Sequence, residues 1–227
     1  MGPRQVVVLG AGMDSRPWRL KLPAGLAWFE VDQAPVLAAK QRALQQAGAQ
    51  ISADDAPAAG AHPLRAASWT AVAADRGGDG WVAALAAAGL DPSRPVVWCA
   101  EGLLMYITED RVRSLLAAAA GSCAPGSAFV AHSLTDGFVA RLRAGERPGA
   151  GATPYPRALQ DAWISGLPED PSAALREAGW GLELVTTRAA IGREICGGAD
   201  AAQALCDFDT APGCTADGEI RFWVAKK

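Results

Sequence analysis

The chain has 227 residues, and 24 acidic against 21 basic side chains give a formal net charge of −3 at pH 7. The basic residues form no stripe, which argues against nucleic acid or an anionic membrane as a partner, and no apolar run is long enough to cross a bilayer. The first residues lack the charged segment and apolar core of a secretory leader, so we expect a cytoplasmic location. Five cysteines without a CxxC spacing and only two histidines predict no metal site.

The first half of the sequence alternates strand-like and helix-like segments. Apolar runs rich in β-branched and aromatic residues predict four strands, within residues 5–10, 26–32, 69–75 and 95–102. Helical spacing predicts a helix over 34–48 with Gly48 as its stop, and another that stops at Gly89. Residues 52–65 have the composition of a loop.

The second half begins in the same rhythm and then becomes irregular. We expect a helix over 108–122, a fifth strand within 124–133, a helix in 171–180 that stops at Gly179, and two final strands, 181–188 and 219–227, that could pair antiparallel. Between them, residues 134–170 hold two weak helices around a Gly/Pro-rich stretch. Such long irregular segments beside a ligand edge are often lids, so we interpret 134–170 as an acceptor-side insertion or lid.

Five strand–helix units followed by a strand pair predict the α/β class, with a mainly parallel sheet covered by helices on both faces. We expect residues 1–227 to form one domain. In such sheets ligands lie beyond the carboxyl ends of the strands. This rule places residues 10–15, Asp32, Asp75 and Glu101 along one edge.

The glycine turn after the first strand is suited to a close ligand. Gly10 and Gly12 permit a sharp bend, but Ser15 stands where a dinucleotide fingerprint has its third glycine. Asp32 ends the second strand, where a carboxylate can accept both hydroxyls of a ribose. The adenosine ligand could be NAD, FAD or S-adenosylmethionine; Asp14 would repel a diphosphate and would suit a sulfonium or an ammonium group.

Five segments together resemble a known family: 6–20, 29–40, 73–81, 89–107 and 175–180. They are similar to the leucine carboxyl methyltransferase-like group of S-adenosylmethionine-dependent methyltransferases, in its bacterial O-methyltransferase branch. The resemblance implies a Rossmann-like sheet with an antiparallel seventh strand and S-adenosylmethionine as cofactor. It implies these cofactor-binding residues: Gly10, Ala11 and Gly12 beside the methionine part, Asp32 with Gln33 at the ribose, Asp75 with Arg76 beside the adenine, Glu101 near the methionine end, and Asp14 and Arg16 in the turn motif. The family usually has Asp-Leu where this chain has Asp75 and Arg76.

The acceptor side is less well defined. We place His132 at the end of the fifth strand, where it could be the general base for a phenol or alcohol, or simply a hydrogen-bonded histidine. A carboxylate acceptor, with a pKa near ~4, needs no base. Tyr106, Tyr155 and Trp163 are candidate substrate contacts. Core packing is the alternative for Tyr106, and an ordinary surface excursion is the alternative for the segment that holds Tyr155 and Trp163.

The residues and the resemblance together predict an S-adenosylmethionine-dependent O-methyltransferase that acts on a carboxylate or hydroxyl of a small molecule. A decayed, non-catalytic methyltransferase fold is the first alternative, and an NAD-dependent oxidoreductase is the second. Family members usually carry a helical region before the first strand, where this sequence shows only residues 1–4. A truncation, a natural minimal form, or a second subunit that covers the gap, as in a homodimer, would each account for this.

Overall fold

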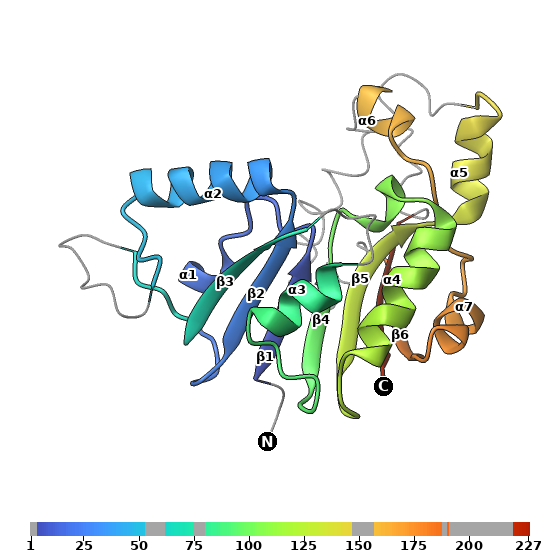
Figure 1. Cartoon of the computed structure of the whole chain (residues 1–227). Helices are drawn as coiled ribbons and strands as arrows, with labels where there is room; N and C mark the ends of the chain where they lie inside the picture. Colours follow the sequence, from blue (N-terminus) through green and yellow to red (C-terminus); the bar gives the residue numbers. More distant parts are fainter. Residues whose placement is uncertain (1–3, 53–61, 75–79, 147–156, 188–189, 191–219) are drawn as a thin grey trace. The chain divides into compact units, whose positions relative to one another are not determined.

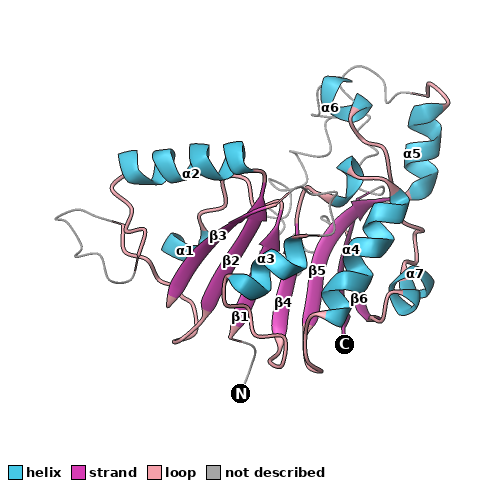
Figure 2. Ribbon diagram, viewed as in Figure 1, coloured by secondary structure: helices cyan, strands magenta, loops and turns pink. Residues whose placement is uncertain are grey.

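The computed structural model describes residues 4–52, 62–74, 80–146, 157–187, 190 and 220–227. Figures 1 and 2 label its elements. The strands are β1 (Gln5–Leu9), β2 (Ala27–Asp32), β3 (Ser68–Ala73), β4 (Val96–Ala100), β5 (Ala128–Leu134), β6 (Gly181–Thr186) and β7 (Ile220–Lys226). The helices are α1 (Arg16–Arg19), α2 (Ala34–Gln46), α3 (Trp81–Ala87), α4 (Glu109–Gly121), α5 (Asp136–Arg143), α6 (Arg157–Asp161) and α7 (Ser172–Glu177), with a 3₁₀ turn η1 (Leu104–Tyr106).

The strands form one sheet in the order β3-β2-β1-β4-β5-β7-β6. Strand β1 pairs in parallel with β2 and β4, β2 pairs in parallel with β3, and β6 pairs antiparallel with β7. The predicted mainly parallel sheet with an antiparallel C-terminal strand is therefore confirmed. The chain divides into two compact units: a first unit of Met1–Glu101, Ala118–Phe129 and Lys227, and a second unit of Gly102–Ala117 and Val130–Lys226.

Strands β1, β2 and β4 of the first unit are largely buried on both faces, which explains their continuous apolar runs. The edge strand β3 is mostly half-buried or exposed. Val8 of β1 is in register with Glu30 of β2 and with Cys99 of β4. Because side chains alternate along a strand, these three point to one face and their neighbours in sequence point to the other. Trp18 of α1 packs edge-on against Trp69 on the first face, with ring centroids 5.3 Å apart.

Helix α3 covers the opposite face of the first unit and lies in front of its strands in Figure 2. Its Trp81 meets Trp98 of β4 edge-on at a centroid distance of 5.7 Å. The three predicted helix stops are confirmed, because Gly48, Gly89 and Gly179 have φ angles of 72°, 100° and 90°. This left-handed backbone closes a helix C-terminus and favours glycine.

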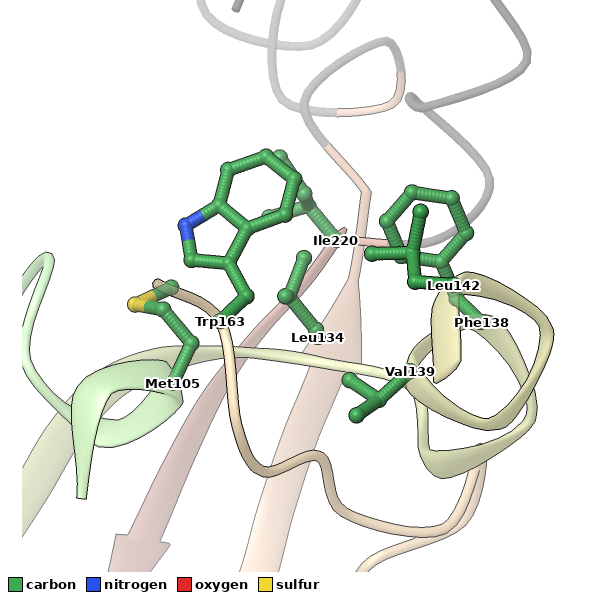
Figure 3. Close-up of a cluster of buried hydrophobic side chains, with 7 residues drawn as sticks. All are labelled: Met105, Leu134, Phe138, Val139, Leu142, Trp163 and Ile220. Carbon is green, nitrogen blue, oxygen red and sulfur yellow. The ribbon is translucent and has the colours of Figure 1, made fainter. Parts of the chain in front are cut away.

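The second unit has its own apolar core, drawn in Figure 3. It combines Met105, Leu134, Phe138, Val139, Leu142, Trp163 and Ile220, all nearly inaccessible to solvent. Thr135 caps α5, because its side-chain oxygen accepts the backbone N–H of Phe138 at 3.3 Å. Helices α5 and α6 match the two weak helices expected in 134–170, but the Gly/Pro-rich residues 147–156 lie outside the described part of the chain.

Two negative findings hold for the described ranges. None of their helices is both long and apolar enough to span a bilayer. In the same ranges, no three His, Cys, Asp or Glu side chains gather in a way that could hold a metal ion.

Candidate functional site

The glycine turn after β1 is held open by backbone conformation. Gly10 and Gly12 have φ angles of 68° and 49°, values that residues with a side chain rarely adopt. The N–H of Gly10 donates to the carbonyl of Val31 at 2.8 Å and ties the turn to β2. A Cβ built on Gly12 would have no heavy atom of the described residues within 4 Å, so this part of the chain leaves the space beside Gly12 free for a ligand.

Asp32 anchors the turn from the end of β2. One of its carboxylate oxygens, Oδ2, accepts the N–H of Gly12 at 2.8 Å. The other oxygen, Oδ1, accepts the N–H of Gln33 at 2.7 Å. The side chain therefore has a structural task that the sequence did not reveal, and its remaining lone pairs are what a ribose would use.

Three charged side chains of the first unit form a chain of contacts beside the turn. The guanidinium of Arg16 lies 2.8 Å from Asp14 through Nε and 2.8 Å from Glu101 through Nη2. Asp14 also accepts the backbone N–H of Arg16 at 2.9 Å, so both of its oxygens are engaged. The guanidinium stands 5.6 Å from the ring centroid of Trp28, within the range of a cation–π contact.

Glu101 differs from Asp14 because one of its two carboxylate oxygens accepts no hydrogen bond from the described residues. Its Oε2 receives both Arg16 and the thiol of Cys99, whose sulfur is 3.5 Å away. No described residue donates to Oε1, and the side chain is 49% exposed. Glu101 is therefore held at one oxygen and open at the other.

Protonation is clear for two groups of this cluster. Burial and the nearby Glu101 together raise the pKa of the Cys99 thiol to about 12, although Arg16 acts in the opposite direction, so at neutral pH the sulfur keeps its proton. Burial alone would lower the pKa of Arg16, but Cys99, Asp14 and Glu101 outweigh burial and raise it above its usual value. Arg16 is thus a permanent cation, and Cys99 is a donor rather than a nucleophile.

The three charged side chains, Asp14, Arg16 and Glu101, line a pocket of about 300 Å³. Its walls are Val8, Gly10, Ala11, Asp14, Arg16, Arg19 and Glu101. The structure thus brings together predicted residues from the ends of β1 and β4, and Arg19 joins them unpredicted. The volume is near the lower limit of small-molecule sites.

A buried ion pair behind the pocket was also missed. Lys40 of α2 donates to Glu30 of β2, and the two side chains are 1% and 0% exposed. The indole N–H of Trp28 donates to the other oxygen of Glu30 at 3.1 Å. An acid inside the otherwise apolar run of residues 26–31 was the available signal, because such a residue is rarely buried without a partner.

His132 does not end the fifth strand as expected, because β5 continues to Leu134. Its Nε2 accepts the backbone N–H of Gly102 at 3.1 Å, and its ring lies against Phe222 with centroids 5.3 Å apart. The structure thus gives His132 a hydrogen-bonding role, while its role as a general base stays a prediction.

The aromatic candidates for substrate contact have different surroundings. Trp163 is 7% exposed, belongs to the core in Figure 3, and donates its indole N–H to the hydroxyl of Tyr106 at 3.3 Å. Tyr106 is only partly buried. Tyr155 lies outside the described residues, as do Asp75 and Arg76, the predicted adenine neighbours.

A family model and many curated relatives match this sequence. The model described as leucine carboxyl methyltransferase aligns with residues 1–120. A Frankia alni protein is 40% identical over 197 residues, which are 86% of this chain and 61% of that protein. A Streptomyces avermitilis protein is 39% identical over 197 residues, 86% of this chain and 62% of that protein. Both are provisionally named S-adenosyl-L-methionine-dependent methyltransferases, and the chain spans about three fifths of their length.

Solved structures share the fold at low sequence identity. The S-adenosylmethionine-dependent methyltransferase from Mesorhizobium loti superposes with a TM-score of 0.53 at 16% identity, over 100% of this chain and 92% of that one. Its likeness shows that the sheet and helices have the Rossmann-like arrangement of the class I methyltransferases.

Proposed function

Because the chain belongs to the leucine carboxyl methyltransferase family, we propose that it is an S-adenosylmethionine-dependent O-methyltransferase that acts on a carboxylate or hydroxyl of a small molecule. The observation that supports this most is the pocket of the first unit, where the glycine turn and the half-free Glu101 meet. The family's cofactor is S-adenosylmethionine, which decides against the oxidoreductase alternative.

The residues present fit this cofactor. The open space at Gly12 admits a ligand close to the backbone, and Asp32 lies directly behind the turn with lone pairs left for ribose hydroxyls. Glu101 offers a carboxylate oxygen, which suits the ammonium of the methionine part. We therefore assign the turn and Glu101 to the methionine part and Asp32 to the ribose.

When bound, the cofactor supplies an electrophilic methyl group on a sulfonium. The protein's part is to fix the two reactants in line and to exclude water, and orientation of this kind supplies on the order of 7–11 kcal/mol. The Asp32 contacts to Gly12 and Gln33 fix the turn before any ligand arrives. Such prior ordering lowers the entropy lost on binding.

Of the two acceptor classes, a carboxylate is better supported. A carboxylate is already ionised at neutral pH, so it needs no proton acceptor. The one candidate base among the described residues, His132, uses its Nε2 to accept from Gly102. The family's name refers to a carboxyl group as well.

Calorimetry combined with a transfer assay tests the proposal. We expect the purified chain to bind S-adenosylmethionine and S-adenosylhomocysteine, and to move a labelled methyl group from the former to a member of a panel of small carboxylic acids, phenols and alcohols. Esters formed on carboxylates are lost on mild alkaline treatment, whereas aryl and alkyl ethers persist, so one step separates the acceptor classes.

Two results would count against the proposal in different ways. Absence of binding heat from both ligands at millimolar concentration would remove it altogether. Binding without transfer to any acceptor would favour the non-catalytic alternative.

A further inference from the structure

Arg16 is a cation placed in the pocket that is proposed to bind the cationic end of the cofactor. By charge alone it would oppose such a ligand, since like charges a few ångströms apart repel. Its contacts suggest a different task. Both ends of its guanidinium are occupied, Nε by Asp14 and Nη2 by Glu101.

The two carboxylates that contact Arg16 are not held equally firmly. Asp14 uses both oxygens on Arg16, one on its side chain and one on its backbone N–H, and its side chain is only 10% exposed. Glu101 uses one oxygen and is 49% exposed. Asp14 therefore fixes Arg16, and Arg16 in turn fixes Glu101.

We infer that Arg16 is a positioning residue, which holds Glu101 so that the free Oε1 receives the ammonium of the cofactor's methionine part. The inference rests on the proposed function, because it concerns the same pocket. Asp14 then serves the ligand indirectly, which revises the expectation that its own charge meets a sulfonium or ammonium.

The surroundings explain why an arginine suits this place. The planar guanidinium can satisfy two carboxylates and still stack on a ring, which a lysine ammonium cannot do. Here the ring is Trp28, with the guanidinium carbon 5.6 Å from its centroid. Trp28 is fixed from behind, because its indole N–H donates to the buried Glu30 at 3.1 Å.

Three ligands and two substitutions separate this role from its alternatives. The ligands are S-adenosylhomocysteine, its decarboxylated form, which keeps the amine, and 5′-methylthioadenosine, which lacks the whole amino-acid part. Arg16→Gln should weaken the two amine-bearing ligands by about tenfold, near the contribution of one hydrogen bond to a charged group. The affinity for 5′-methylthioadenosine should stay within about twofold, which also reports an intact site.

Arg16→Lys keeps the positive charge but lacks a guanidinium that can reach Asp14 and Glu101 together. It should therefore also weaken the two amine-bearing ligands, by a smaller factor than Arg16→Gln, and spare 5′-methylthioadenosine. Arg113→Gln is the matched control, because Arg113 also bridges two acids, Glu109 and Glu177, but on the exposed surface of the second unit. It should leave all three affinities unchanged.

Other outcomes overturn the inference. If Arg16→Gln strengthens binding of the decarboxylated ligand, Arg16 acts by charge repulsion. If it weakens S-adenosylhomocysteine but spares the decarboxylated form, Arg16 contacts the carboxylate directly. Full affinity in Arg16→Lys, or equal losses for all three ligands, would also contradict positioning. In each of these cases wild-type binding leaves the proposed function standing, whereas a wild type that binds none of the ligands removes both.

Discussion

Lys40 and Glu30 show how one pair of side chains can decide the stability around a site. Taking a charge out of water costs several kcal/mol, and the attraction to a charged partner must offset this cost. Burial raises the pKa of Glu30, while Lys40 lowers it, and the net result is a pKa above the usual value. The pair is therefore a place where removing one partner costs far more than removing both.

We expect Lys40→Met to lower the free energy of unfolding by about 3–5 kcal/mol at pH 8, the usual cost of an uncompensated buried charge. Without Lys40 the folded-state pKa of Glu30 rises further. The loss of unfolding free energy should be smallest at pH values below about 4.3, the pKa of a glutamate in the unfolded chain. It should grow as the pH rises through the pKa of Glu30 in the folded protein. Urea unfolding at a series of pH values measures this. The double variant Glu30→Gln/Lys40→Met should recover most of the loss, and a pH-independent loss would show that the packing of Lys40 matters instead.

The strand-to-helix turn after β1 is the element in which backbone conformation and ligand access can be separated. Gly12 and Gly48 both have positive φ angles, 49° and 72°, and both have open space where a Cβ would stand. An alanine at either place therefore meets strain but no clash. Only Gly12 lies at the proposed cofactor site, whereas Gly48 closes helix α2.

Gly12→Ala and Gly48→Ala should each destabilise the fold by about 1–2 kcal/mol, the cost of a left-handed residue with a side chain. Only Gly12→Ala should also weaken S-adenosylhomocysteine, because its new methyl group enters the space that the ligand requires. Chemical unfolding and calorimetry on the two variants test this. Equal cofactor affinity in both variants would contradict a ligand beside Gly12.

Elements were more predictable from the sequence than contacts between them. The strands, the helix stops at Gly48 and Gly89, and the placement of Asp32 and Glu101 at strand ends follow from local periodicity and glycine chemistry. The bridge from Asp14 through Arg16 to Glu101 does not, because it joins residues 85 positions apart through side-chain rotamers. His132 was misplaced by two residues for a related reason, since a mixed run such as 128–134 gives no local signal for the end of a strand.

At the level of the whole protein, the parallel core explains why the cofactor part of the prediction is stronger than the acceptor part. In the first unit, β1 lies between β2 and β4, so the ends of three adjacent strands supply Gly10, Asp32 and Glu101. The parallel pairing of these strands therefore places the candidate cofactor-binding residues at the same edge of the sheet. The acceptor candidates depend on side chains such as Tyr106 and Trp163, whose packing the sequence does not specify.

A ligand that binds only the folded chain must raise its thermal stability, and the size of the effect can be stated in advance. At one hundred times its dissociation constant, S-adenosylhomocysteine should add about 2.7 kcal/mol. For a chain of this size that corresponds to a rise in Tm of roughly 5–11 °C.

Asp32→Ala leaves the N–H groups of Gly12 and Gln33 without their acceptor, so it should lower the Tm of the free protein. At the same ligand concentration it should also shrink the ligand-induced rise by roughly a third to nine tenths, because about 1–3 kcal/mol of affinity is lost with the ribose acceptor. Differential scanning calorimetry measures both effects, and an undiminished ligand-induced rise in Asp32→Ala would place the ribose elsewhere.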